Sequence, residues 1–205
     1  MKLYTSPRAP NPRRVDMFLA EKGIVDIERV LVDINAGQHK SVEFSARNPV
    51  QRVPVLELDN GRMLAESRAI CGYLEALHPE PNLLGCNAEE HAFIEMADRQ
   101  VEFSIFATIA NAVRHTHPGL APLENPQFKD FGASQLAKLN DNARWLDEQL
   151  SRHAYVAGDR FTIADITAFC AVEFARLLKW KPADFGLLHL QAWRDRIAER
   201  PSAQL

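Results

Sequence analysis

Residues 52–74, RVPVLELDNGRMLAESRAICGYL, decide how the first part of this 205-residue chain folds. Residues 54–58 are apolar enough for a strand, and Asn60-Gly61 is a strong signal for the turn of a β-hairpin. Residues 62–65 would then form the returning strand. A helix should follow, with one apolar face formed by Ile70, Leu74 and Leu77. The stretch therefore predicts a strand, a turn, a strand and a helix in succession.

The residues before this stretch predict two further strands and two helices. Residues 2–4 begin the first strand, and residues 27–32 form the second. Asn11-Pro12 is typical of a helix start, with Asn as N-cap and Pro in the first turn, and Gly23 is typical of a helix end. A short polar helix is expected over 39–47. The predicted order up to residue 77 is β-α-β-α-β-β-α.

The second part of the chain is predicted to be helical throughout. Residues 78–87, HPEPNLLGCN, contain two prolines and a glycine and are typical of a linker. Apolar residues then recur at helical spacing in four segments, marked by Ala97, Val101 and Ile105, by 136–150, by 162–178, and by Leu190, Trp193 and Ile197. Thr162 and Asp165 form a capping box at the start of the third of these helices. We expect an α/β domain over 1–77, a linker over 78–87 and an all-helical domain over 88–205.

Composition argues against several classes of partner. The formal net charge is only −3, which favours neither nucleic acid nor an anionic membrane surface. The sequence has no run of 18 apolar residues, so it predicts no transmembrane helix. The N-terminus lacks the apolar core of a signal peptide. The three cysteines are far apart and form neither a CxxC pair nor a zinc-ligand pattern. We therefore expect a cytoplasmic protein without a metal site.

Three segments together resemble the signature motifs of the cytosolic glutathione S-transferase family. They are NPVQRVPVLEL (48–58), LAESRAICGYL (64–74) and AGDRFTIADI (157–166), and the resemblance covers essentially the whole chain. It implies an α/β plus all-α fold, with an N-terminal thioredoxin-like domain that binds glutathione and a C-terminal helical bundle. It also implies glutathione as co-substrate, small hydrophobic electrophiles as partners, and a homodimer.

The resemblance assigns glutathione contacts to four residues of the first two motifs. Pro54 matches a proline with a cis peptide bond, and the backbone of Val53 would pair with the cysteinyl part of glutathione like an added strand. Ser67, at a helix N-terminus, would bind the γ-glutamyl carboxylate, and Glu66 would lie near the α-ammonium. From its position alone, Ser67 is equally typical of an N-cap.

Two further residues match positions that hold the glycyl carboxylate, namely His39 and Arg52. Lys40 is a neighbour that could take the place of His39, which would otherwise be an ordinary surface histidine. Gln51 replaces a small residue of the signature, and this departure bears on the contact of Arg52 more than on that of Val53.

The catalytic position departs from the common pattern. An ordinary thiol has a pKa of about 8.5, so a transferase must stabilise the thiolate of glutathione. The position that carries serine in serine-type branches falls on Ala9, which cannot donate a hydrogen bond. Tyr4 comes too early and is typical of the core, and Thr5 and Ser6 also precede the position. The side-chain amide of Asn11 could donate, although N-capping would also explain this residue.

This departure resembles an atypical yeast and bacterial branch of the family that lacks a catalytic Tyr, Ser or Cys. The resemblance rests on YTSPRAPNPRRV (4–15), AGQHKSVEF (36–44) and HTHPGL (115–120). In that branch the thiolate is thought to be stabilised by amides at the start of the first helix and by a water held by a second-domain histidine, which matches His115. A histidine at a helix end that contacts carbonyls or solvent is the alternative, and His117 would face another way.

Three functions follow from this pattern. The first is conjugation of glutathione to small apolar electrophiles, in a pocket lined by the helix over 103–114 and by Trp180. The second is a non-catalytic glutathione-binding, ligand-binding or protein-interaction module of the same fold. The third, a thiol-disulfide reductase or glutathione lyase of the same fold, would need a cysteine at or near Ala9, and the nearest candidate is Cys71.

Overall fold

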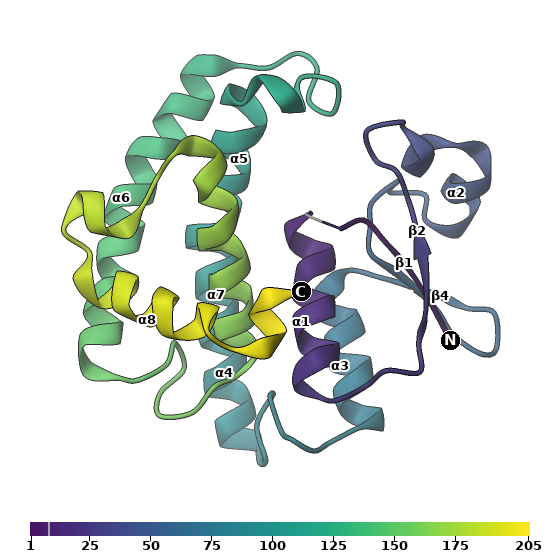
Figure 1. Ribbon diagram of the computed structural model, residues 1–205, viewed down its shortest axis with the longest axis horizontal. Coiled ribbons are helices and arrows are strands. Elements are labelled where there is room, and N and C mark those ends of the chain that lie inside the picture. Colours follow the sequence, from purple (N-terminus) through teal and green to yellow (C-terminus); the bar gives the residue numbers. More distant parts are fainter. Residues whose placement is uncertain (8) are drawn as a thin grey trace. The chain divides into compact units, whose positions relative to one another are not determined.

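A computed structural model describes residues 1–7 and 9–205, so Arg8 lies outside the described residues. The chain divides into two compact units, residues 1–82 with Leu205 and residues 83–204 (Figure 1). Each unit is described by itself below. The finer division into 1–77, a linker over 78–87 and 88–205 stays a prediction.

A four-stranded mixed sheet forms the centre of the first unit. Its strands lie in the order β2-β1-β3-β4, with β1 parallel to β2 and antiparallel to β3, and β3 antiparallel to β4. The bounds are β1 (Lys2–Thr5), β2 (Glu28–Leu31), β3 (Val55–Glu57) and β4 (Met63–Ala65). All four strands lie where the sequence predicts them, which confirms the predicted hairpin at Asn60-Gly61.

Helices cover both faces of this sheet. They are α1 (Pro10–Glu21), the 3₁₀ turn η1 (Gln38–Lys40), α2 (Val42–Arg47) and α3 (Ser67–Leu77). Figure 1 shows α1 and α3 on one side of the sheet and α2 on the other. Successive side chains of a strand point to opposite faces of the sheet, so each face can bury apolar residues. Tyr4 and Val55 pack with Phe44 of α2, while Leu3 and Leu56 are fully buried on the opposite face. The predicted order β-α-β-α-β-β-α is confirmed.

Helix α1 begins two residues before the predicted start. Its N-cap is Ala9 and Pro10 is its first residue, so the prediction that Asn11 is the N-cap is wrong. Proline fits any position of the first turn, so the sequence offered two compatible starts. The predicted end is confirmed: Gly23 has φ 66°, and the Ile24 N–H donates to Leu19 O at 2.9 Å in a Schellman-type closure.

A buried lysine ties the end of α1 to the end of α3. The side chain of Lys22 is 0% exposed, and its Nζ donates to His78 O and to Pro81 O, both at 2.7 Å. The same ammonium pairs with Glu75. Burying a charge is costly unless it is paired and hydrogen-bonded, and these three partners satisfy an ammonium's three donors. Lys22 thereby fixes the chain where it leaves α3.

The second unit is entirely helical. Its elements are α4 (Ala88–Gln100), η2 (Val101–Phe106), α5 (Ala107–Thr116), η3 (Pro118–Leu120), α6 (Lys129–Arg152), α7 (Ile163–Phe174), η4 (Ala175–Leu178), η5 (Pro182–Phe185), α8 (Leu188–Ala198) and η6 (Pro201–Gln204). The predicted apolar stripes lie inside, since Val101, Ile105, Leu190 and Ile197 are all buried. No described helix has the length and apolar character to cross a membrane.

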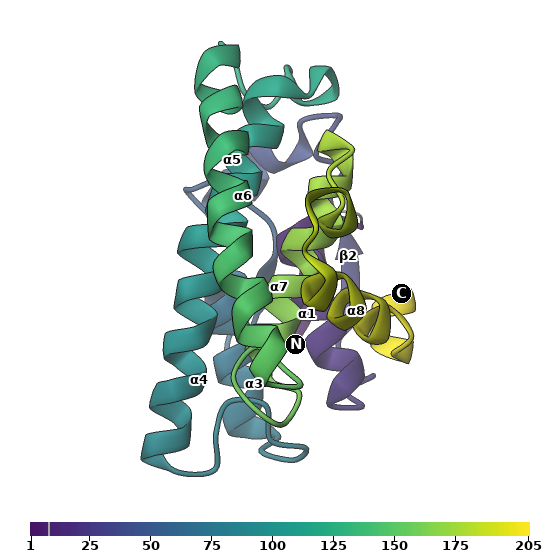
Figure 2. The ribbon, with the colours of Figure 1, turned by 90° about the vertical axis from the view of Figure 1, so that its left-hand side faces the viewer.

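Helices α5 and α6 pack along each other, as Figure 2 shows. Close approach depends on Gly132 of α6, because a Cβ built there would lie 2.6 Å from Thr116 Cγ2 and 3.1 Å from His115 Cβ. Before α5 the chain forms one π-helical segment, η2, which the sequence did not predict. There the Ser104 carbonyl accepts from Thr108 Oγ1 at 2.8 Å and from Asn142 Nδ2 of α6 at 2.5 Å.

The predicted capping box at the start of α7 is confirmed. Asp165 Oδ2 accepts from the Thr162 N–H at 3.0 Å. Its Oδ1 accepts from the Val156 N–H at 3.0 Å and from Trp193 Nε1 at 2.9 Å. Complete burial raises the pKa of Asp165 to about 6, against the lowering effect of these hydrogen bonds. One carboxylate thus connects the loop before α7, α7 itself and α8.

Candidate functional site

The ends of all four strands place the predicted first-unit site residues at one edge of the sheet. Tyr4 pairs with Val55, and Val55 pairs with Ala65. Continuing that register by two residues brings Val53 and Ser67 to the same edge. Helix α1 starts there after β1, and the segment containing His39 follows β2 at that edge.

Val53 presents an unused stretch of backbone at this edge. The Val53–Pro54 peptide bond is cis, as the resemblance implies. Across residues 1–7 and 9–205, neither the N–H nor the C=O of Val53 has a hydrogen-bond partner, and the residue is only half-buried. A backbone donor and acceptor left open beside a sheet can pair with an extended peptide.

The loop before Val53 is held by its own side chains. Asn48 is buried, its Nδ2 donates to Arg52 O at 2.9 Å, and its Oδ1 accepts from the Val50 N–H at 3.2 Å. Gln51 has φ 56°, the left-handed region that favours glycine, and its Nε2 donates to Ser45 Oγ at 2.9 Å. The small residue of the signature therefore corresponds to a backbone requirement, which Gln51 meets at a conformational cost.

Glu66 and Ser67 form the other side of this edge. Glu66 is exposed, occupies the N-cap position of α3 and has φ 67°. Such a conformation in a non-glycine residue is uncommon and clusters at ligand sites. Ser67 is the first residue of α3, so the alternative that it is the N-cap is wrong. Its hydroxyl accepts from Arg14 Nη1 at 2.8 Å, a contact of two buried side chains that the sequence analysis missed.

Three basic side chains gather near the η1 turn. His39 is 8% exposed, and its Nδ1 is buried without a hydrogen-bond partner in the described part of the chain. Burial lowers the pKa of His39, and the positive charges of Lys40 and Arg52 lower it further. The structure therefore brings His39 and Arg52 within electrostatic reach of each other. A buried unsatisfied nitrogen beside two cations suits an anionic ligand, and Lys40 remains a possible participant.

The start of α1 offers one free backbone donor. Pro10 and Pro12 have no N–H, and the Ala9 N–H donates to Ser6 O at 3.3 Å. Among the described residues, only the Asn11 N–H remains unpaired in this first turn, and Asn11 is exposed. The resemblance assigns thiolate stabilisation to amides at the start of this helix. Among the described residues, the Asn11 N–H is the one amide of the first turn that is available for that role.

The other residues considered for catalysis in the first unit are buried. Tyr4 is 8% exposed and donates its hydroxyl to Glu57 Oε2 at 2.7 Å. This hydrogen bond, together with burial, raises the pKa of Tyr4, which makes it a poor source of a phenolate. Thr5 and Ser6 are buried, and so is the Cys71 thiol that a reductase would need at the surface.

His115 belongs to the second unit, where its ring holds the start of α6. Its Nδ1 accepts from the Phe128 N–H at 3.1 Å, and the ring lies edge-on to Phe131 at 5.0 Å. Because Nδ1 accepts, the proton of the neutral ring sits on Nε2, which lies 3.9 Å from Glu124 Oε1. His117 is differently engaged, since its Nδ1 accepts from the Gly119 N–H at 3.2 Å. His115 therefore has structural contacts at the start of α6, and its role toward glutathione stays a prediction.

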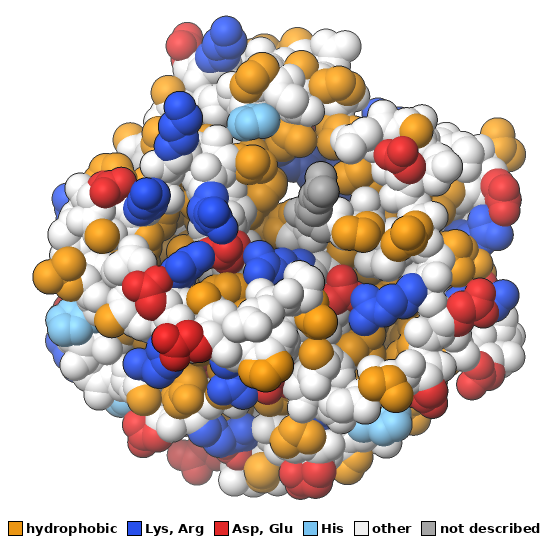
Figure 3. All heavy atoms as spheres, in the orientation of Figure 1, with side chains coloured by type: hydrophobic (Ala, Val, Ile, Leu, Met, Phe, Trp, Pro, Cys, Tyr) orange, Lys and Arg blue, Asp and Glu red, His pale blue; other side chains and the backbone are white. Residues whose placement is uncertain are grey.

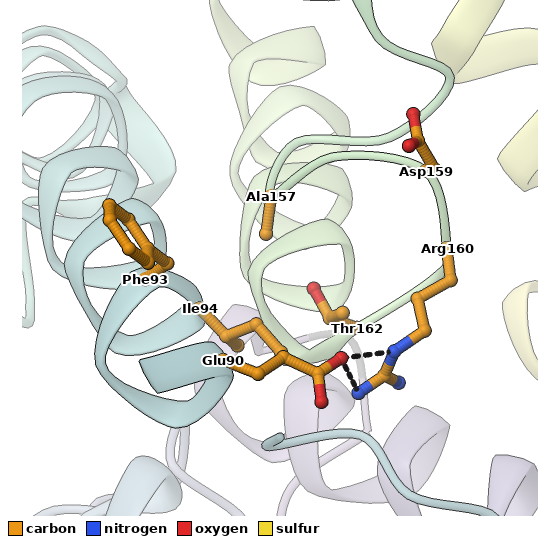
Figure 4. A pocket seen from close by; sticks show the side chains of 7 residues that line it. All are labelled: Glu90, Phe93, Ile94, Ala157, Asp159, Arg160 and Thr162. Carbon is orange, nitrogen blue, oxygen red and sulfur yellow. Dashed lines mark hydrogen bonds and ion pairs between the residues drawn. The ribbon is translucent and has the colours of Figure 1, made fainter. Parts of the chain in front are cut away.

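None of these residues lines the pocket of about 310 Å³ that the second unit contains (Figure 4). It is crossed by Arg160, whose Nε and Nη2 contact Glu90 Oε1 at 2.7 and 2.6 Å, and it is bordered by Phe93. Trp180, expected to line an electrophile pocket, is 3% exposed and donates to Asn140 Oδ1 at 3.0 Å. In the described residues no three His, Cys, Asp or Glu side chains are placed to hold a metal ion.

Comparison with known proteins identifies the class. The family model for the glutathione S-transferase N-terminal domain matches residues 3–82, and the model for the C-terminal domain matches residues 115–201. Glutathione S-transferase 2 of Saccharomyces cerevisiae is 36% identical over 206 residues, covering 100% of this chain and 88% of that protein. The chain therefore belongs to the glutathione S-transferase family.

Two solved structures agree with this conclusion. The crystal structure of Gtt2 from Saccharomyces cerevisiae is 35% identical with a TM-score of 0.94, covering 100% of this chain and 99% of that chain. A glutathione S-transferase domain-containing protein from Marinobacter aquaeolei VT8 is 40% identical with a TM-score of 0.93, covering 99% of this chain and 100% of that chain. The predicted fold, a thioredoxin-like domain followed by a helical domain, and the predicted enzyme class, a glutathione transferase, are confirmed.

Proposed function

We propose that the sheet edge at Val53 and Ser67 binds glutathione and that the chain transfers its thiol to small apolar electrophiles. The cysteinyl backbone pairs with Val53 beside Pro54, and the γ-glutamyl carboxylate binds at Ser67 and the N-terminus of α3. Glu66 lies near the α-ammonium, and His39 and Arg52 hold the glycyl carboxylate. The observation that carries the proposal is the unpaired N–H and C=O of Val53 at the edge that Ser67 shares.

Thiolate stabilisation is assigned to the start of α1, as in the atypical branch of the family. Lowering a thiol pKa by two units takes about 2.7 kcal/mol. A hydrogen bond to a charged group is worth about 1.5–3 kcal/mol, so one well-placed donor supplies most of that amount. The Asn11 N–H is the free donor of this turn, and the Asn11 side-chain amide is a second candidate. His115, through a bound water, is a third, although its Nδ1 is already engaged by Phe128.

The test is a pH titration of enzyme-bound glutathione, followed by the ultraviolet absorbance of the thiolate, with turnover of a chloro-nitrobenzene substrate measured alongside. Asn11→Ala removes the side-chain amide and keeps the N–H, whereas Asn11→Pro removes both. We expect Asn11→Ala to titrate like the wild type and Asn11→Pro to titrate about one to two pH units higher, because the backbone donor is lost.

His115→Gln is the companion variant, because glutamine keeps an acceptor for the Phe128 N–H. An unchanged thiol pKa in this variant, together with a raised one in Asn11→Pro, assigns activation to α1. The reverse result assigns it to His115. A wild type that fails to bind millimolar glutathione contradicts the whole proposal, since the nucleophile would be missing.

The non-catalytic alternative predicts a different outcome of the same titration. A binding module would take up glutathione without lowering its thiol pKa and without turnover. Nothing in the comparisons favours this alternative, since the relatives reported above carry the name of the enzyme.

The proposal includes a cytoplasmic homodimer, as the family resemblance implies. Phe93, Met96 and Phe103 are 57%, 48% and 68% exposed along α4 and η2, and exposed apolar side chains on successive turns are typical of protein contacts. On the face shown in Figure 3, acidic and basic side chains are interspersed. Light scattering that finds a single chain's mass at micromolar concentration contradicts the dimer.

A further inference from the structure

The contact between Arg14 and Ser67 lies beneath the proposed carboxylate site. Arg14 is 1% exposed on α1, Ser67 is 4% exposed at the start of α3, and Arg14 Nη1 donates to Ser67 Oγ at 2.8 Å. The two residues are 53 positions apart, so the contact depends on the packing of α1 against α3.

This contact determines the direction of the Ser67 proton. A guanidinium has only donors, so Ser67 Oγ must accept, and its own O–H is directed elsewhere. A hydroxyl that already accepts a charge-assisted hydrogen bond is also a stronger donor, because hydrogen bonds in a chain polarise one another. Arg14 thus prepares Ser67 to donate to an acceptor at the sheet edge.

The charge of Arg14 acts in the same direction. Its cationic guanidinium lies one hydrogen bond behind the first residue of α3. The N-terminus of that helix carries the positive end of the helix dipole. Both effects favour an anion that contacts Ser67, and in a buried setting they are only weakly screened.

We propose that Arg14 is a positioning residue for the α-carboxylate of the γ-glutamyl group. It orients the Ser67 hydroxyl as a donor and supplies positive charge behind it, without touching the ligand. The inference rests on the proposed function, since it presupposes that glutathione binds at this edge. It adds a specificity determinant on α1, a helix otherwise assigned only to the thiol.

The experiment compares two ligands by calorimetry: glutathione, and γ-aminobutyryl-cysteinyl-glycine, which lacks only the α-carboxylate. We expect the wild type to prefer glutathione by about 10- to 100-fold, as for one hydrogen bond to a charged group. Arg14→Met and the neutral, polar Arg14→Gln should both reduce this preference to a few-fold. Ser67→Ala should also reduce the preference, and the combined loss in Arg14→Met/Ser67→Ala should be smaller than the sum of the two single losses, because the two side chains share one hydrogen bond.

The matched control is Lys22→Met, which removes another buried cation of the first unit. It should lower the melting temperature yet keep the full preference for glutathione. A folded Arg14 variant that keeps the wild-type preference overturns the proposal, and so does Ser67→Ala with an unchanged preference. A wild type that binds neither ligand contradicts the proposed function instead, so the two failures are distinguishable.

Discussion

The two units differ in what fixes their structure, which is backbone conformation at one edge of the first unit and side-chain burial in the second. In the first unit, the sheet edge that we propose binds glutathione contains unusual backbone: a cis bond before Pro54 and left-handed conformations at Gln51 and Glu66. In the second unit, order comes from buried stripes on long helices and from one buried carboxylate, Asp165, with donors from three segments. Sequence motifs indicate the residues of that edge and the capping box of Asp165, whereas hydrophobic periodicity indicates most helices of the second unit.

The largest effect is expected from Asp165→Asn in the second unit. An amide group leaves one of the facing donors, at Val156, Thr162 or Trp193, opposite another donor in a fully buried place. We expect a loss of about 2–4 kcal/mol in the free energy of unfolding, measured by denaturant titration. Asp159→Asn is the control, since its side chain is 97% exposed and its loss should lie within about 0.5 kcal/mol. Equal effects of the two substitutions would contradict the role of Asp165.

Two glycines, one in each unit, compare helix packing directly. Gly132→Ala would force a Cβ to within 2.6 Å of Thr116, whereas a Cβ at Gly72 of α3 would meet only Arg68 Nη1 at 3.6 Å. Overpacking costs about 1–3 kcal/mol, and alanine gains up to about 1 kcal/mol in helix propensity. We therefore expect Gly132→Ala to destabilise and Gly72→Ala to stabilise slightly. A Gly132→Ala variant as stable as the wild type would contradict the importance of the close approach of α5 and α6 at this glycine.

Acid should act on the two units in opposite directions. The pKa of His39 is lowered in the folded chain, so its contribution to stability is present above about 6.5, the unfolded value, and is lost as the pH falls through its folded pKa. The pKa of Asp165 is raised to about 6, so its contribution is present below about 3.8 and is lost as the pH rises through about 6. Relative to His39→Gln, the wild type should lose stability on acidification.

Melting temperatures between pH 4 and 8 check this prediction. The wild type should gain stability relative to Asp165→Asn as the pH falls from about 6 to about 4. Parallel pH profiles for the wild type and either variant would contradict the assignment for that residue.

The smallest effect is expected at Gln51. Glycine adopts φ 56° without strain, but Gln51→Gly also loses the hydrogen bond to Ser45 and makes the unfolded chain more flexible. These effects oppose each other, so the net change should stay below about 1 kcal/mol. Gln51→Ala loses the same hydrogen bond and keeps the strain, so it should be the less stable of the two. The opposite ranking would mean that the flexibility of glycine in the unfolded chain outweighs the backbone strain at this position.

The sequence predicted the elements well, and its errors have physical causes. The start of α1 was placed at Asn11 because Asn before Pro is a good helix start, yet Pro10 satisfies the same rule two residues earlier. Leu77 fits the apolar stripe of α3 but is 49% exposed, since it is the last residue of that helix. The π-helical turn at 101–106 has no local signal, because it reflects tertiary packing against α6.

The site was only partly accessible to sequence reasoning. Val53, Pro54, Glu66 and Ser67 were named through their motifs, and the strand register brings them to one edge. The contact between Arg14 and Ser67 has no signal in the sequence, because only the packing of α1 on α3 buries Arg14. The sequence already shows that Pro10 and Pro12 have no backbone N–H to donate. This fact limits the donors at the start of α1 only once the helix is known to begin at Pro10.

The burial of Lys22 makes its chemical modification a measure of how the first unit opens. Its ammonium is fully covered and held by two carbonyls and Glu75, whereas Lys2, for example, has a side chain that is 47% exposed. An acylating reagent should therefore modify Lys2 in the folded chain and reach Lys22 only when the ends of α1 and α3 separate. Peptide mass mapping after timed labelling would measure the modification of Lys22 against that of Lys2. It would thereby report how often the ends of α1 and α3 separate, without a fluorescent probe or an engineered label.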